Sequence, residues 1–218
     1  MIFIELSIHL IKKELHTPSY YKIEDEAVID QFIRENSFGT LISVGSPYPL
    51  ATHIPMELEV NQQGKSVLWG HISKANPQWQ SWATYPNVLA VFLSPVHQYI
   101  SSSWYNHANV PTWNYMSVHV SGDLRIVNGD ELKESLRRLT DKYEMNSQHP
   151  VSLDSLPLSV QNQMNGVVGF EITIAHKVAS FKLSQNRNDE DFKNIIFQLK
   201  NSGRPEAIRM AEIMEKIR

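Results

Sequence analysis

The sequence predicts an α+β protein in which an antiparallel sheet or barrel carries peripheral and C-terminal helices. Two observations support this class. Several runs of strand-forming residues follow one another through short turns, and helical periodicity is confined to segments near the start and in the second half. Successive strands joined by short turns favour antiparallel pairing over a parallel sheet with crossover helices.

Strand-like segments dominate the region between residues 38 and 127. The turn-forming run Gly45-Ser-Pro-Tyr-Pro49 separates the first two segments and predicts a hairpin. The clearest strand alternates strictly, with Met116, Val118 and Val120 on one face and Ser117, His119 and Ser121 on the other. The expected strands are Phe38–Val44, Leu50–Val60, Ser66–Ser73, Val88–Leu93, Trp113–Val127 and Val167–Ile174.

Helical periodicity marks the remaining elements. Asp25–Glu35 has an acidic first turn and an apolar stripe, and we expect Asp130 to cap a helix over Glu131–Met145. Two C-terminal helices are separated by Ser202-Gly-Arg-Pro205. Shorter helical pieces are expected in Asn76–Thr84 and Ser152–Met164.

Composition excludes several classes of function. The 218 residues contain no cysteine, which excludes a disulfide framework, a thiolate zinc site and a cysteine nucleophile, and which is compatible with the cytoplasm. A net charge of −3 provides no overall attraction to nucleic acid. The apolar run Ile2–Ile11 is too short to span a membrane and lacks the charge order of a signal peptide, so no membrane association is expected.

Three polar stretches are candidates for ligand binding. Gly70–Pro77 offers His71, Ser73 and Lys74 where a strand meets a helix, a combination suited to phosphate, although on local sequence alone a simple capped junction is the commoner explanation. Ser101–Tyr115 alternates aromatic and amide residues that suit a planar ring, or a loop fixed by its own aromatics. Lys182–Arg187 suits an anionic ligand, or a helix-capping loop.

Other chemistry lacks a pattern. The histidines show no metal-ligand spacing, and no GxSxG turn is present, so the sequence predicts no metal site and no catalytic residue. The segment 189–218 mixes six basic with six acidic residues, which is not the pattern of a DNA-reading helix.

Taken together, the stretches resemble one family, the PaiB-type FMN-binding negative transcriptional regulators. The resemblance extends from about Thr17 to Leu199. It depends on these motifs: Pro18-Ser-Tyr-Tyr21, Phe38-Gly-Thr-Leu41, Ala51-Thr-His-Ile-Pro55, Gly70-His-Ile-Ser-Lys-Ala-Asn-Pro-Gln-Trp79, Ser103-Trp-Tyr105, Val110-Pro-Thr-Trp-Asn-Tyr115 and Lys182-Leu-Ser-Gln-Asn-Arg187. It implies a split β-barrel of the flavin-reductase and pyridoxamine-phosphate-oxidase type, and a homodimer that holds FMN in clefts at the subunit interface.

The resemblance also implies roles for individual residues. His71, Ser73 and Lys74 would hold the phosphate, with Thr52 and His53 on a neighbouring strand. The residues beside the isoalloxazine ring would be Trp113, Asn114 and Tyr115, with Gln185 and Arg187 closing the site.

Domain limits follow from the same motifs. We expect an N-terminal extension over 1–16, an FMN-binding split barrel over 17–187 and a helical pair over 188–218. The family's usual start, Met-Tyr-x-Pro, corresponds to Leu15-His-Thr-Pro18, which suggests that translation begins at Leu15.

Two functions are open at this point. The resemblance implies an FMN-binding regulator that represses transcription, directly or through a partner, and the absence of an assignable acid or base favours a role without catalysis. The alternative is a flavin-dependent oxidoreductase acting on a small molecule, since a barrel type by itself does not assign function.

Overall fold

The computed structural model describes residues 17–61 and 63–218, so the predicted extension 1–16 and its proposed start at Leu15 lie outside the described residues. The strands form one antiparallel sheet in the order β3-β2-β6-β8-β9-β5-β4, with β1 added to β9 and β7 to β8. Their bounds are β1 Lys22–Ile23, β2 Phe38–Ser43, β3 Leu50–Pro55, β4 Glu57–Val60, β5 Ser66–Ser73, β6 Asn87–Leu93, β7 Gln98–Ile100, β8 Thr112–Val127 and β9 Val167–Lys182.

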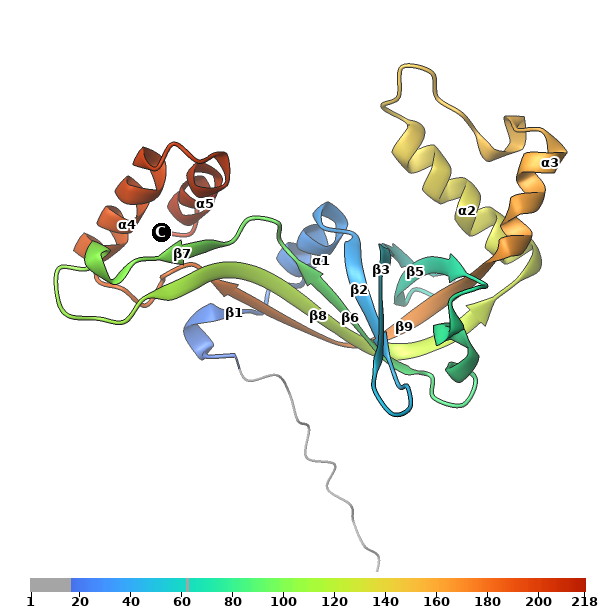
Figure 1. Cartoon of the computed structure of the whole chain (residues 1–218), viewed down its shortest axis with the longest axis horizontal. Helices are drawn as coiled ribbons and strands as arrows, with labels where there is room; N and C mark the ends of the chain where they lie inside the picture. Colours follow the sequence, from blue (N-terminus) through green and yellow to red (C-terminus); the bar gives the residue numbers. More distant parts are fainter. Residues whose placement is uncertain (1–16, 62) are drawn as a thin grey trace, which may run out of the picture.

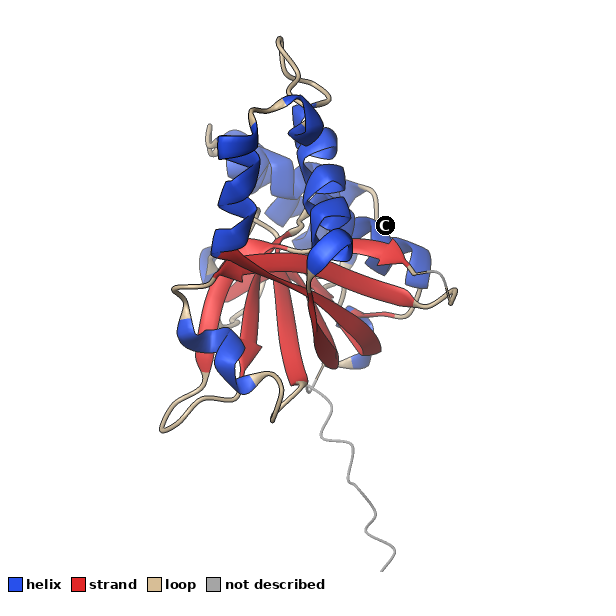
Figure 2. Cartoon of the chain, turned by 90° about the vertical axis from the view of Figure 1, so that its right-hand side faces the viewer, coloured by secondary structure: helices blue, strands red, loops and turns tan. Residues whose placement is uncertain are grey.

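Most of the helices lie on one side of this sheet, in the upper part of Figures 1 and 2. The C-terminal pair lies with β7 at one end of the long strands, and α2 projects from the other end. The α-helices are α1 Glu26–Glu35, α2 Gly129–Glu144, α3 Leu158–Gln161, α4 Asp189–Asn201 and α5 Pro205–Glu215, and the 3-10 helices are η1 Ser19–Tyr21, η2 Pro77–Ser81, η3 Ser102–Trp104, η4 Leu153–Ser155 and η5 Asn162–Gly166.

The sheet curls until β3 approaches β5, although these strands are not hydrogen-bonded neighbours. A side-chain bond reinforces this closure, because Asn76 after β5 donates its Nδ2 to Thr52 Oγ1 on β3 at 2.8 Å. The predicted antiparallel split barrel with peripheral helices is therefore confirmed.

The expected segment Leu50–Val60 is two strands rather than one. The chain changes partners at Met56, whose amide bonds to the Ser37 carbonyl at 2.8 Å, so β3 pairs with β2 whereas β4 pairs with β5.

The two longest strands, β8 and β9, form a curved ribbon that runs the length of the molecule (Figure 1). The predicted final strand ended too early, at Ile174, because the run Ala175-His-Lys177 interrupts the apolar pattern. Pairing with β8 carries β9 on to Lys182, across a register shift at Ser121 and Gly122. Only glycine fits at this shift, since a Cβ on Gly122 would lie 2.3 Å from the Thr173 carbonyl oxygen.

One face of the sheet forms the core. The predicted alternation in β8 is confirmed, because Met116, Val118 and Val120 are buried against the apolar stripe of α1 and the interior of α4 and α5. The expected cap of α2 is wrong: the helix begins at Gly129, where Asn128 is the N-cap and Asp130 lies in the first turn. The helix thus begins two residues earlier than expected, at a glycine whose φ of 59° lies in the region that glycine adopts readily.

The opposite face of the sheet, here called the outer face, has no charged side chains in its central rows. One row runs His53, Thr40, Val91, His119, Val178 and the next runs Ala51, Ile42, Leu89, Ser121, His176. Phe38 and Leu93 continue the outer face and are 67% and 53% exposed. Large apolar side chains left this exposed on a sheet are typical of an interface.

Candidate functional site

The ten predicted site residues fall into two groups. The first group, the β5 end, contains Thr52, His53, His71, Ser73 and Lys74; the second, the β8 end, contains Trp113, Asn114, Tyr115, Gln185 and Arg187. The residues of β5 itself lie at the opposite end of the β8–β9 ribbon from Tyr115, whereas His53 of β3 is in register, through Thr40 and Val91, with His119 in the middle of β8. His71 pairs with Gly169, which also pairs with Val127 of β8, whereas Tyr115 pairs with Lys182. At about 3.3 Å per residue, the stretch of β8 from Tyr115 to Val127 measures roughly 40 Å along the strand.

At the β5 end, the strand terminus leaves one ammonium and one hydroxyl at the surface. Ser73 and Lys74 are both exposed, and the Lys74 side chain forms no ion pair within residues 17–61 and 63–218. The turn between them is fixed by the Ser73 Oγ, which accepts from the Ala75 amide at 3.2 Å, and by the Lys74 amide, which donates to the Gly166 carbonyl. Burial lowers the pKa of His71, so this ring is neutral at pH 7.

A buried polar network holds this end together, and sequence reasoning missed its centre, Gln78. Its Nε2 donates to the carbonyls of Leu41 and Leu50 at 3.1 and 3.3 Å, and to Ser43 Oγ at 3.1 Å. Its Oε1 accepts from Thr52 Oγ1. Thr52 therefore supports the closure of the barrel. A glutamine between a proline and a tryptophan carries no periodic signal of burial, which is why the pattern did not identify it.

His53 follows Thr52 on β3 and points to the opposite side, as successive strand residues do. Its Nδ1 lies 2.8 Å from Thr40 Oγ1, so it belongs to the outer face. The two predicted residues of β3 thus serve different surfaces, one the barrel closure and one the outer face.

At the β8 end, Trp113 and Tyr115 are accessible but Asn114 is not. Trp113 is 53% exposed and packs edge-on against Tyr99 of β7, with ring centroids 5.8 Å apart. Asn114 is fully buried, where its Oδ1 accepts from Ser184 Oγ at 3.0 Å and its Nδ2 faces Met214 of α5. Asn114 therefore supports the loop after β9, and its side chain has no accessible atom with which to bind the edge of an isoalloxazine ring.

The loop from Leu183 to Asn188 is held by its own side chains. Gln185 accepts from the Leu183 amide at 2.7 Å and donates to the Phe181 carbonyl at 2.6 Å. Ser184 adopts a φ of 63°, a left-handed conformation that non-glycine residues rarely adopt, and Asn114 stabilises it. Strain of this kind persists only where the surrounding structure fixes it, so this loop is a rigid platform for Arg187.

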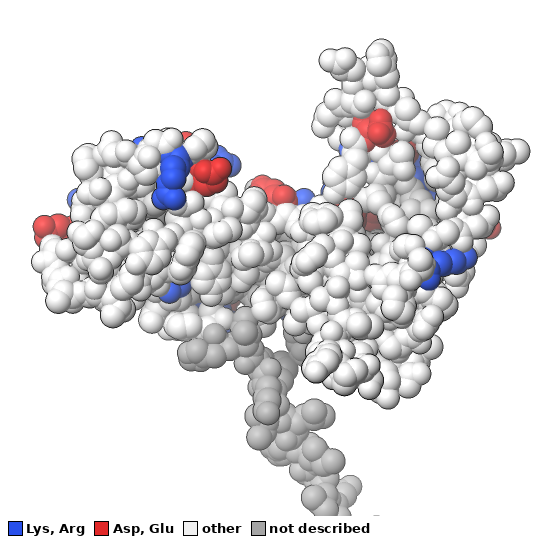
Figure 3. Space-filling model, in the orientation of Figure 1, with Lys and Arg blue, Asp and Glu red and all other residues white. Residues whose placement is uncertain are grey.

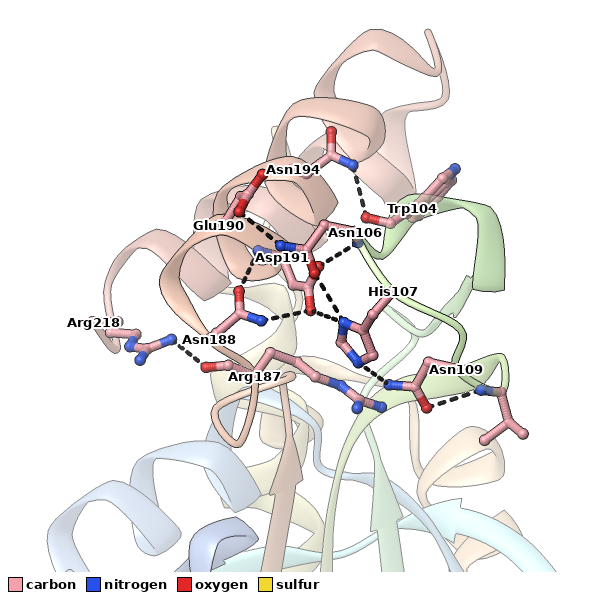
Figure 4. Close-up of polar contacts among 11 residues, drawn as sticks. Trp104, Asn106, His107, Asn109, Arg187, Asn188, Glu190, Asp191, Asn194 and Arg218 are labelled. Carbon is pink, nitrogen blue, oxygen red and sulfur yellow. Dashed lines mark hydrogen bonds and ion pairs between the residues drawn. The ribbon is translucent and has the colours of Figure 1, made fainter.

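Arg187 lies beside a polar cluster that the sequence did not reveal (Figure 4). Its guanidinium carbon is 4.7 Å from the ring centroid of Tyr105. Next to it, the buried carboxylate of Asp191 accepts from the amide of Asn106 at 2.8 Å and from Asn188 Nδ2 at 3.0 Å, and lies 3.4 Å from Nδ1 of His107. The half-exposed His107 ring is held by its two neighbouring amides, with Asn106 Oδ1 2.9 Å from its Nδ1 and Asn109 Nδ2 3.3 Å from its Nε2, and the Asp191 carboxylate lies behind it.

A separate cleft of about 880 Å³ lies between α2 and the strand edge. Trp69 on its floor is flanked by the guanidinium groups of Arg125 and Arg138, at 5.7 and 5.5 Å. Arg125 pairs with Glu131 and the buried Glu171, and Arg138 pairs with Glu59. The arginines of the cleft are thus used in pairs within the fold, which makes it a poorer candidate for an anionic cofactor than the two ends of the ribbon.

Metal and membrane sites receive no support from the described part of the chain. Within it, no group of His, Asp or Glu side chains is placed to hold a metal ion. None of the helices described there has the length and apolar character required to cross a membrane.

Comparison with known proteins shows the same fold and family. Residues 15–176 match the family described as "Putative FMN-binding domain". The protease synthase and sporulation protein PAI 2 of Bacillus subtilis is 41% identical over 202 residues, covering 92% of this chain and 97% of that protein. An uncharacterised protein of Emericella nidulans is 28% identical, covering 81% of this chain and 87% of its own.

Solved structures confirm the barrel. The FAD and heme binding protein from Mycobacterium smegmatis superposes with a TM-score of 0.59 at 16% identity, covering 79% of each chain. The flavocytochrome Anf3 from Azotobacter vinelandii superposes with a TM-score of 0.58 at 15% identity, covering 82% of this chain and 78% of its own. With its family match and its relation to PAI 2, the chain belongs to the PaiB-type family of FMN-binding split-barrel proteins.

Proposed function

We propose that this protein is a homodimeric regulator that binds FMN between its two copies, each site combining the β5 end of one protomer with the β8 end of the other. The separation of the two groups along one ribbon carries this proposal. A single FMN is far too short to contact both ends of a strand segment that measures roughly 40 Å. A two-fold axis that sets the ribbons antiparallel would bring opposite ends together twice, in two equivalent sites.

The outer face is the surface that suits this pairing. Its central rows contain small, apolar and imidazole side chains, and the exposed Phe38 and Leu93 extend it. The view in Figure 3 is largely free of charged residues across the strands. Depletion of charge with exposed aromatic and apolar groups is typical of the core of a protein interface.

Within each site, Lys74 and Ser73 would bind the phosphate together with His71. Their exposed ammonium and hydroxyl fit a dianionic group, and the neutral imidazole adds one donor. Trp113 and Tyr115 would lie against the isoalloxazine ring, and His53 would approach from the outer face. Asn114, Thr52 and Gln185 would act by fixing the elements that carry these groups. Bound FMN supplies reversible one- or two-electron redox chemistry.

The regulatory role rests on family membership and on the lack of an assigned catalytic group. If the protein represses transcription, we expect it to act through a partner protein rather than by binding DNA itself, because the C-terminal segment 189–218 balances six basic with six acidic residues. A cysteine-free chain is compatible with action in the cytoplasm.

One observation favours the alternative, a flavin-dependent oxidoreductase. A histidine beside a buried carboxylate, as His107 is beside Asp191 at 3.4 Å, is a common arrangement for proton transfer. Turnover of NAD(P)H by the FMN-loaded protein, lost in His107→Asn, would favour the enzyme. A yellow protein without turnover favours regulation, and a salt-dependent gel shift on promoter DNA tests direct binding.

Complementation between subunits tests the shared site directly. Lys74→Gln damages the β5 end and Trp113→Ala damages the β8 end, so each variant alone should bind FMN weakly. After the two are unfolded and refolded together, mixed dimers should carry one undamaged site, which restores about a quarter of the sites in the mixture.

The readout is quenching of flavin fluorescence, with size-exclusion light scattering for the oligomeric state. Recovery after mixing, absent when each variant is refolded by itself, supports the proposal. A monomeric protein, or a mixture that binds no more FMN than its components, would show that the site is not shared. Phe38→Asp should separate the dimer and abolish FMN binding together.

A further inference from the structure

Two cations lie side by side at the β8 end without a carboxylate partner. Lys182 is the last residue of β9 and Arg187 lies in the loop that follows. Neither forms an ion pair within residues 17–61 and 63–218. Lys182 Nζ contacts Thr112 Oγ1 and lies 5.7 Å from the ring centroid of Tyr21. Burial lowers the pKa of Lys182, and the positive charge of Arg187 lowers it further to a smaller extent. The two cations therefore repel each other when no anion lies between them.

Buried polar atoms beside these cations also lack partners. The Oη of Tyr105 and the Nε of Arg187 are both inaccessible to solvent and form no hydrogen bond to any described residue. Tyr105 as a whole is only 8% exposed. An unsatisfied buried donor is costly, and such groups in folded proteins usually await a ligand, ion or water.

The nearest buried carboxylate is already used. Asp191 is surrounded by the Asn106 amide, Asn188 and His107, and no interaction joins it to the guanidinium of Arg187 (Figure 4). The excess positive charge of Lys182 and Arg187 therefore remains unneutralised within the described residues.

The platform under these groups is rigid. The left-handed Ser184 is fixed by Asn114, and the Gln185 side chain bonds to the Leu183 amide and the Phe181 carbonyl, so the backbone of the loop that carries Arg187 is held in place. A site whose donors are held in place before binding does not lose affinity to their ordering.

We propose that Lys182, Arg187 and Tyr105 form an oxyanion site for the carboxylate or phosphate of a small second ligand, which would lie beside the flavin. The location rests on the proposed function, because Tyr115, assigned to the ring, is the cross-strand partner of Lys182. The phosphate of FMN lies at the opposite end of that cofactor and is assigned to the β5 end of the other protomer. The ligand class is therefore a small organic acid or phosphate ester.

The test is a calorimetric titration of the full-length, FMN-loaded protein with inorganic phosphate in a buffer without oxyanions. Wild type should bind one phosphate per chain. Lys182→Gln and Tyr105→Phe should each weaken this binding about tenfold, the loss expected for one hydrogen bond to a charged group. Both should leave FMN affinity within a factor of about two, since neither residue is assigned to FMN.

Tyr105→Phe also guards against a purely structural explanation. It removes a hydroxyl that has no hydrogen-bond partner among the described residues, so the variant should melt at the same temperature as wild type or higher while losing phosphate affinity. Lys193→Gln removes an exposed positive charge from α4 and is the matched control, with phosphate binding unchanged.

Two results would overturn the proposal. One is the absence of phosphate binding by both the FMN-loaded and the FMN-free protein. The other is competition, in which phosphate binds only the FMN-free protein and FMN displaces it, so that the cations hold the phosphate of FMN itself. If FMN fails to bind at all, the proposed function fails. The titration of the FMN-free protein with phosphate then still tests the oxyanion site, which is supported if Lys182→Gln weakens phosphate binding and refuted if it does not.

Discussion

Gln78 is the residue whose replacement most directly tests how the barrel closure supports the β5 end. Its side chain is 1% exposed and joins the carbonyls of Leu41 and Leu50, the hydroxyl of Ser43 and the hydroxyl of Thr52. Gln78→Leu keeps the approximate volume of the side chain and removes all of these bonds. The change therefore isolates the polar network from the packing.

The expected cost follows from the groups that are left behind. Each buried group that loses its partner costs about 1–3 kcal/mol, and the more favourable burial of leucine offsets part of that sum. We expect the free energy of unfolding to fall by about 3 kcal/mol. For a chain of this size, that corresponds to a melting temperature lower by roughly 6–12 °C. FMN affinity should fall as well, because Thr52 and the turn at Ser73 and Lys74 lose their common anchor.

Urea unfolding at fixed protein concentration measures the first effect, and quenching of flavin fluorescence measures the second. Gln80→Leu is the matched control, since Gln80 is an exposed glutamine of the same short helix. A loss of stability in Gln78→Leu that does not exceed the loss in Gln80→Leu would refute the reasoning. It would mean that water, or relaxation of the strands, satisfies the freed carbonyls at little cost.

Three further predictions concern other parts of the molecule. Burial lowers the pKa of both His71 and His119 below the ordinary value of 6.5. As pH falls from 7, the unfolded chain therefore binds more protons than the folded chain, and the free energy of unfolding should decline. His119→Gln should flatten that decline in pH-dependent urea unfolding. Ser184→Gly relieves the positive φ that Ser184→Ala retains, so Gly should be more stable than Ala by about 1 kcal/mol in thermal melts, and equal stability would contradict the strain. Arg125→Met leaves the buried Glu171 unpaired and should cost about 2 kcal/mol, a value reduced for the half-exposed guanidinium; Arg137→Met, which breaks ion pairs between residues of α2 only, should leave stability close to that of wild type in the same assay.

Local pattern was enough to predict most elements. Alternation in Trp113–Val127 predicted the face of β8 that is buried, and turn residues predicted the β2–β3 hairpin. Failures occurred where pairing with another segment decides the outcome. The half of β9 beyond Ile174 exists because β8 offers it a partner, and the break at Met56 exists because β4 pairs with β5 whereas β3 pairs with β2. Pairing between segments leaves no mark on the periodicity within either one.

For the site, residue types and motif order were sufficient to predict the ligand and ten candidate positions. The sequence by itself determined that side chains of the types that can bind phosphate and pack against a planar ring are present, because those chemistries require particular side chains. Only the tertiary structure decided which candidates are accessible, since burial of Asn114 depends on Met214, a hundred residues away. It also decided that the candidates of β5 itself lie at the opposite end of the β8–β9 ribbon from Tyr115. That separation arises from strand register, which hydrogen bonding between distant segments sets and no single segment encodes.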